Sequence, residues 1–103
     1  EGKLRRLASA VDVAREKLQR AVRMVEERKD ADYFDLMARP LCRMETIVLV
    51  SYMLLRDATR DRARAVVAER FVLDWLPEVN AHYEVIERHD VSLIDSHEQI
   101  LAL

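Results

Sequence analysis

Apolar residues recur at steps of three and four along the first quarter of the chain, with charged residues between them. The recurring residues are Leu4, Leu7, Val11, Ala14, Leu18, Val22 and Val25. This spacing places them on one stripe of an amphipathic helix, because a helix completes a turn about every 3.6 residues. The pattern predicts a helix over residues 3–28.

A second helix is predicted over residues 32–57, with Asp30 or Asp32 in the sequence position of an N-cap. Its residues 41–55 are apolar on nearly all faces, which is typical of a helix surrounded by protein. We therefore expect this helix at the centre of the fold. Pro40 lies inside it and predicts either a kink or a helix that ends one residue earlier and restarts.

A third helix is predicted over residues 60–89, with a bend at Pro77. The residues expected on its inner side are Ala63, Val66, Val67, Phe71, Trp75, Val79, Tyr83 and Ile86. A short last helix is predicted within residues 89–103. Its apolar residues, which need a surface to pack against, are Leu93, Ile94, Ile100, Leu101 and Leu103.

Short connections between these segments predict helices that alternate in direction. The expected fold is all-α: an antiparallel, up-down bundle of three long helices and a short C-terminal helix. Residues 1–103 should form a single domain. The chain has one glycine, whereas β-rich or dinucleotide-binding folds need several glycines in their turns. The composition therefore agrees with the helical pattern.

Charge and hydropathy exclude two classes of partner. Residues 1–29 carry nine basic and five acidic side chains, and residues 74–103 carry one and seven. The basic segment is interspersed with acids and lacks aromatic side chains for base stacking, so we expect no nucleic acid. The most apolar run, residues 46–55, is too short to span a bilayer, so we expect no membrane. The single Cys42 is expected to be a buried thiol in a reducing compartment, which predicts a cytoplasmic protein.

Metal and nucleophile patterns are weak throughout. Di-iron bundles use Glu-x-x-His motifs, and none is present; Glu78 and His82 are four residues apart, and His89 lies two turns beyond His82. Asp95, His97 and Glu98 fall at the start of a predicted helix, where adjacent side chains point in different directions and do not converge on one ion. No histidine neighbours Cys42 in sequence. The serines lack the glycines of a nucleophile elbow: Ser9, Ser51, Ser92 and Ser96.

Two further sets of residues allow a functional and a structural interpretation. Glu45 is either a buried base with a raised pKa or one half of an ion pair with Arg39, Arg43 or a distant arginine. We favour the ion pair. Phe71, Trp75 and Tyr83 either line a cofactor pocket or belong to the core, and we favour the core. We therefore expect no catalytic, cofactor-binding or metal-binding residue in this chain.

Residues 32–100 resemble the C-terminal helical extension of the acyl-CoA dehydrogenase family. The resemblance rests on "AERFVLDWLPEVNAHYEVIE", where Ala68, Phe71, Leu76 and Pro77 match an Ala-x-x-Phe and Leu-Pro pattern, and on the tail "VIERHDVSLIDSHEQIL". It implies a parent flavoprotein of fatty-acid metabolism that uses FAD and a glutamate base to remove hydrogens from Cα and Cβ of an acyl-CoA. That machinery belongs to upstream domains of the same polypeptide.

The resulting hypothesis is a non-catalytic packing or interface domain of an acyl-CoA dehydrogenase-like oxidoreductase. The chain begins at Glu1 rather than Met, and we expect it to be a C-terminal segment of a larger, homo-oligomeric protein. Two alternatives remain open. One is a free-standing helical adaptor or regulatory protein that dimerises or binds a partner helix. The other is a small ligand-binding bundle with an internal pocket near Trp75 and Glu45.

Overall fold

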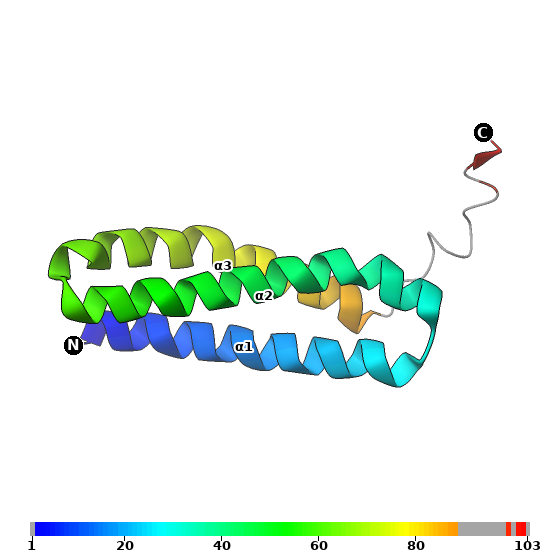
Figure 1. The fold of residues 1–103 in the computed structure, drawn as a ribbon, viewed down its shortest axis with the longest axis horizontal. Coiled ribbons are helices and arrows are strands. Elements are labelled where there is room, and N and C mark those ends of the chain that lie inside the picture. Colours follow the sequence, from blue (N-terminus) through cyan, green and yellow to red (C-terminus); the bar gives the residue numbers. More distant parts are fainter. Residues whose placement is uncertain (1, 89–98, 100, 103) are drawn as a thin grey trace.

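The computed structural model describes residues 2–88, 99, 101 and 102 of the chain, and these residues confirm the all-α fold. Its two reversals of direction place α2 antiparallel to both α1 and α3, as Figure 1 shows. The described residues contain no strand, and the predicted short helix within 89–103 lies almost entirely outside them. The elements in chain order are α1 (Gly2–Arg28), α2 (Ala31–Arg60), the short 3-10 helix η1 (Arg62–Arg64) and α3 (Ala65–Glu87).

Two residues, Lys29 and Asp30, connect α1 to α2. Lys29 adopts a left-handed conformation with φ of 53°, which costs a non-glycine residue about 1 kcal/mol. The Asp30 side chain accepts hydrogen bonds from the backbone N–H groups of Asp32 and Tyr33, at 3.0 and 3.2 Å. Asp30, the first of the two predicted caps, is therefore the N-cap of α2.

Both helices that contain a proline continue through it. α2 includes Pro40 and α3 includes Pro77, so the alternative that the second helix ends and restarts is wrong. Each proline removes one backbone hydrogen bond from its helix. Met37 and Met44, on either side of Pro40, are both buried. Their burial against the other helices offsets the lost bond and keeps α2 in one piece.

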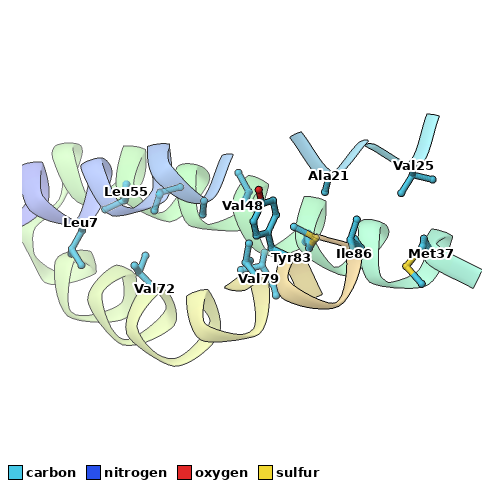
Figure 2. Packing of buried hydrophobic residues seen from close by; sticks show 14 of the residues in the cluster. Leu7, Ala21, Val25, Met37, Val48, Leu55, Val72, Val79, Tyr83 and Ile86 are labelled. Carbon is cyan, nitrogen blue, oxygen red and sulfur yellow. The ribbon is translucent and has the colours of Figure 1, made fainter. Parts of the chain in front are cut away.

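The core lies between the three helices, each of which contacts both others. Figure 2 shows side chains from all three meeting along the bundle axis. The apolar stripe predicted for α1 is confirmed at Leu7, Val11, Ala14 and Val25. The buried apolar residues of the other helices are Tyr33, Met37, Met44, Ile47, Val48, Leu55 and Ala58 of α2, and Ala68, Val72, Val79, Tyr83 and Ile86 of α3.

The prediction that α2 is enclosed by protein on all faces is wrong. Leu49 is 58% exposed and Met53 is 49% exposed. In a bundle of three, each helix has only two neighbours, so one face of every helix remains in solvent. The apolar character of residues 41–55 therefore exceeds what this chain buries. No helix in the described part of the chain is long and apolar enough to cross a membrane.

The inner face predicted for the third helix is correct in its second half and wrong in its first half. Val79, Tyr83 and Ile86 are buried as predicted. Ala63 precedes α3, in η1, and is exposed. The early core positions of α3 are instead Ala68 and Val72. The remaining predicted residues face solvent or the edge of the bundle: Val66, Val67, Phe71 and Trp75.

Candidate functional site

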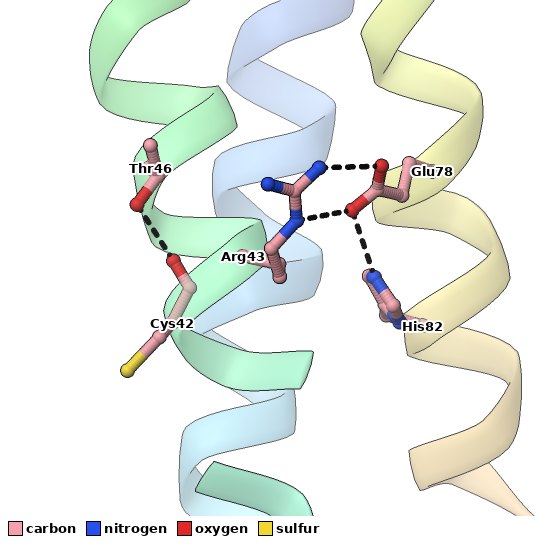
Figure 3. Close-up of polar contacts among 5 residues, drawn as sticks. All are labelled: Cys42, Arg43, Thr46, Glu78 and His82. Carbon is pink, nitrogen blue, oxygen red and sulfur yellow. Dashed lines mark hydrogen bonds and ion pairs between the residues drawn. The ribbon is translucent and has the colours of Figure 1, made fainter. Parts of the chain in front are cut away.

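A polar cluster joins the middle of α2 to the second half of α3. The Arg43 guanidinium donates two hydrogen bonds to the Glu78 carboxylate, from Nε at 2.8 Å and from Nη2 at 2.9 Å. His82, one turn beyond Glu78, places Nε2 3.0 Å from the same carboxylate (Figure 3). Glu78 of α3 therefore contacts both Arg43 of α2 and His82 of α3.

This cluster keeps Glu78 ionised. The hydrogen bonds from Arg43 and then from His82 lower the pKa of Glu78 to about 2, although partial burial acts in the opposite direction. The same contact raises the pKa of Arg43 above its ordinary value. A carboxylate with so low a pKa is a poor proton acceptor at neutral pH, because a general base works best when its pKa is near the operating pH. The cluster is therefore a structural link.

Two residues considered for chemistry from the sequence lie near this cluster on α2. Cys42 is exposed, so the predicted buried thiol is wrong; its backbone carbonyl accepts a hydrogen bond from Thr46 Oγ1 at 2.9 Å. Glu45 is exposed as well and forms no ion pair within the described part of the chain. The predicted pairing of Glu45 is wrong, because Arg43 binds Glu78 instead. Neither side chain is held in a shielded position.

The outer side of α3 carries a shallow groove of about 430 Å³. We call it the α3 groove; its lining residues are Val66, Val67, Arg70, Phe71, Asp74 and Trp75. Val66 is 71% exposed, Val67 55% and Trp75 41%. Apolar side chains therefore form much of a surface that faces solvent. The two charged side chains of the groove form an ion pair with each other, with Arg70 Nη2 3.0 Å from Asp74 Oδ1.

Trp75 connects the α3 groove to the polar cluster. Its ring centroid lies 6.1 Å from that of Phe71, with the planes inclined at 33°. The Arg43 guanidinium carbon lies 5.7 Å from the centroid of the same ring, in the range of a cation–π contact. Arg43 therefore supports both Glu78 and Trp75. These contacts fix the indole at the rim of the groove, where its outer side remains open.

The arrangement does not bring together a reactive set of side chains among the described residues. No group of three or more His, Cys, Asp or Glu residues is placed there to hold a metal ion. The Ser51 hydroxyl is fully buried and has no hydrogen-bond partner, and Ser9 is exposed. His89, Asp95, His97, Glu98 and the two other serines, Ser92 and Ser96, lie outside the described residues.

The internal ligand pocket proposed near Trp75 and Glu45 is also wrong. Both residues lie on the surface, and Glu45 is absent from the lining of the α3 groove. The feature that sequence analysis missed is the exposure of Val66, Val67 and Trp75, which it assigned to the inner side of the third helix. The open surface they form is suited to a contact with another protein, since exposed apolar surface of this kind is a common mark of interfaces.

Comparison with known proteins identifies the family of the chain. A family model described as "Acyl-CoA dehydrogenase C terminal" matches residues 1–94. The match includes α1, which the resemblance over residues 32–100 did not cover. Searches of curated proteins and of solved structures gave no match. Because the family model spans all three helices of the bundle, this chain belongs to the acyl-CoA dehydrogenase C-terminal domain family.

Proposed function

We propose that this chain is a non-catalytic packing domain attached to an acyl-CoA dehydrogenase-type enzyme, and that it contributes contact surface to the assembled protein. The family match supports the enzyme class. The observation that carries the packing role is the α3 groove, where apolar side chains face solvent and the two charged side chains are already paired. Such a surface is stabilised when protein covers it, and it offers no free group to a substrate.

The flavin implied by the family does not fit the α3 groove. The pyrophosphate of FAD is normally held by cationic side chains or by free backbone N–H groups at a glycine-rich turn. In the α3 groove the one cationic side chain, Arg70, is bound to Asp74. The carboxylate of Asp74 would repel a phosphate. We therefore assign flavin and acyl-CoA binding to other parts of the enzyme and derive no reaction step here.

Substitutions in the complete enzyme that contains this chain test the absence of chemistry. Cys42→Ser, Glu45→Gln and His82→Gln remove three of the side chains that sequence analysis considered for catalysis or metal binding. We expect each variant to keep acyl-CoA oxidation within about twofold of the parent enzyme, because no reacting group is lost. Reduction of an artificial electron acceptor measures the rate. A hundredfold loss in a folded, flavin-loaded variant would contradict the proposal.

The contact role has a separate test in the same enzyme. Trp75→Asp introduces a charge into the α3 groove and should disturb assembly, which sedimentation and thermal release of the flavin measure. Leu73→Asp places the same charge at a position that is 52% exposed and does not line the groove. We expect the first variant to dissociate or to lose thermal stability and the second to match the parent. Equal behaviour of the two variants would contradict a contact role for the groove.

The coding sequence upstream of Glu1 provides a further check. The proposal expects an acyl-CoA dehydrogenase body in the same polypeptide or in a protein that binds this chain. A chain that is expressed alone in the cell and binds no such body would remove the basis for the packing role. It would favour the adaptor hypothesis instead.

A further inference from the structure

One end of the bundle concentrates positive charge. α1 begins at the same end at which α2 turns into α3 (Figure 1), and the ion pair between Lys3 and Glu69, at 3.2 Å, joins the starts of α1 and α3 there. We call this region the basic end; it comprises residues 2–6 and 56–64. These residues include seven basic and two acidic side chains, whereas the whole chain has a net charge of −2.

Most cations of the basic end have no carboxylate partner in the described part of the chain. Lys3 is paired with Glu69, and Arg64 is paired with Asp61 at 3.6 Å. The other five are exposed to solvent and form no ion pair with a described residue: Arg5, Arg6, Arg56, Arg60 and Arg62. We call these five the unpaired arginines. They are available to bind anions outside the chain.

The helix dipoles add to this positive charge. α1 and α3 both begin at the basic end, and the partial positive charge of a helix N-terminus favours acidic residues. The first turns of α1, η1 and α3 contain no acidic residue. Instead, Lys3 lies in the first turn of α1, and Arg62 and Arg64 immediately precede α3. This arrangement is unfavourable in the isolated chain, and an anionic partner converts the repulsion into attraction.

A hollow of about 290 Å³ within the basic end indicates the chemistry of the partner. Its lining residues are Asp57, Arg60, Asp61 and Arg64. The Arg60 guanidinium can bind a carboxylate with two parallel hydrogen bonds. The two aspartates would repel a nucleic acid or an anionic lipid surface, whose charges are all of one sign. A protein surface can present carboxylates to the arginines and a cation to Asp57.

We propose that the basic end docks on an acidic protein surface, whose carboxylates bind Arg60 and the other unpaired arginines. In the proposed function this surface belongs to the enzyme body, so the identity of the partner rests on that function, while the contact itself is separate from the α3 groove. Exposed ion pairs contribute more to association rate and orientation than to affinity. The contact therefore orients the bundle on its partner and weakens as salt screens the charges.

A fluorescein-labelled peptide of about ten glutamates, used as a probe of a carboxylate-rich surface, tests this chemistry with the isolated chain. Fluorescence anisotropy at low salt should show binding that is lost at about 0.5 M NaCl. Reversing two charges of the basic end, with Arg60→Glu and Arg62→Glu, should weaken binding about tenfold or more. Absence of binding by the wild-type chain would overturn the proposal, as would tighter binding of single-stranded DNA or anionic vesicles of matched charge.

A matched double variant controls for net charge. Arg20→Glu and Arg23→Glu reverse two exposed arginines of α1 that lie outside the basic end and form no ion pair with a described residue. Both double variants change the net charge by the same amount, and circular dichroism checks that both stay helical. The control should bind the peptide within about threefold of the wild type. Equal losses in the two variants would show an effect of net charge alone and would overturn a localised site.

The same variants in the complete enzyme test the identity of the partner. At low salt the basic-end variant should release flavin at a lower temperature than the parent, and the difference should vanish at about 0.5 M NaCl. The control variant should match the parent at both salt concentrations. A loss that does not depend on salt, or no loss at all, would overturn docking on the enzyme body.

Failure of this inference is distinguishable from failure of the proposed function. If Trp75→Asp disturbs assembly but the glutamate peptide does not bind, the packing role of the α3 groove stands and the acidic partner is wrong. If the peptide binds at the basic end but Trp75→Asp and Leu73→Asp behave alike, the basic end stands and the contact role of the groove is wrong.

Discussion

The two halves of α3 place similar side chains in opposite environments. In the first half, Val66 and Val67 are mostly exposed, whereas in the second half Val79 and Ile86 are fully buried. All four are apolar and all lie in one continuous helix. Hydrophobicity therefore does not decide which side chains this bundle buries. The direction of each side chain around the helix axis decides it, because Ala68 and Val72 in the same first half are buried.

The geometry of the helix explains the difference. A four-residue step advances about 40° beyond a full turn, so a row spaced only by fours winds around the helix. The row Val67, Phe71, Trp75, Val79 and Tyr83 turns through about 160°, which carries it from solvent into the core. The core residues of α3 are separated in sequence by three, four or seven positions. Their directions around the helix axis therefore stay within about 60° of one another. These residues are Ala68, Val72, Val79, Tyr83 and Ile86.

The largest effect is expected when an aspartate is introduced at one or the other of two neighbouring positions in the first half of α3. Val72 is 1% exposed and its neighbour Leu73 is 52% exposed. Val72→Asp buries an unpaired carboxyl group and should lower the free energy of unfolding by about 3 kcal/mol or more. Leu73→Asp should change it by no more than about 0.5 kcal/mol. Urea denaturation followed by circular dichroism measures both, and similar losses would show that this half of α3 is oriented differently.

Truncation across the two halves should give a smaller contrast. Ile86→Ala removes a fully buried side chain and should cost about 2–5 kcal/mol, depending on how far the core closes around the gap. Val67→Ala removes a mostly exposed one and should cost no more than about 0.5 kcal/mol. The same denaturation experiment applies. A costly Val67→Ala would place that residue in the core after all.

Sequence analysis predicted the helices well because their signals are local. The stripe from Leu7 to Val25, the cap at Asp30 and the short connections each depend on a few neighbouring residues. These features determine the all-α fold and its antiparallel order. The register error in α3 was avoidable from sequence, since the winding of a four-residue row follows from helix geometry alone. The exposed groove could therefore be predicted from the sequence by calculating the angle of each residue around the helix axis instead of counting residues between apolar positions.

Other features depend on which helix lies beside which, and the sequence does not carry that information locally. Arg43 and Glu78 are 35 residues apart, and their contact depends on the lateral position of α3 against α2. Glu45, only two residues from Arg43, therefore looked like an equally good partner. The exposure of Cys42 has the same origin, because a helix that is apolar on several faces gives no indication of the face that lacks a neighbour.

A buried hydrogen bond secures the second half of α3 and predicts a more modest effect. The Tyr33 hydroxyl at the start of α2 donates to the backbone carbonyl of Ile86 at 3.3 Å, with both residues buried. Tyr33→Phe keeps the ring and removes this bond, which should cost about 1 kcal/mol. Tyr52→Phe removes an exposed bond to Asp12 and should cost less. Amide hydrogen exchange near Ile86 should accelerate in the first variant only.

The smallest effect is expected where the two halves of α3 meet, at Glu78. Its pKa is about 2 in the folded chain and near the ordinary 4.5 in the unfolded chain, because Arg43 and then His82 bind its ionised form. A carboxyl group whose pKa is lowered by folding contributes stability above its unfolded pKa, and it loses that contribution as the pH falls through its folded pKa. The contribution should therefore be complete above about pH 5 and should decline between about pH 4.5 and 2.

Glu78→Gln isolates this contribution from the other acidic groups. The difference in free energy of unfolding between wild type and variant should be constant from about pH 7 to 5 and should shrink toward pH 2. The difference should be small, since the ion pair is partly exposed and screened by solvent and salt. Glu84→Gln changes an exposed glutamate of the same helix that forms no ion pair within the described residues, and it serves as the control. If both variants follow the same pH profile, Arg43 does not hold Glu78 in solution, and the support for Trp75 at the rim of the groove is lost with it.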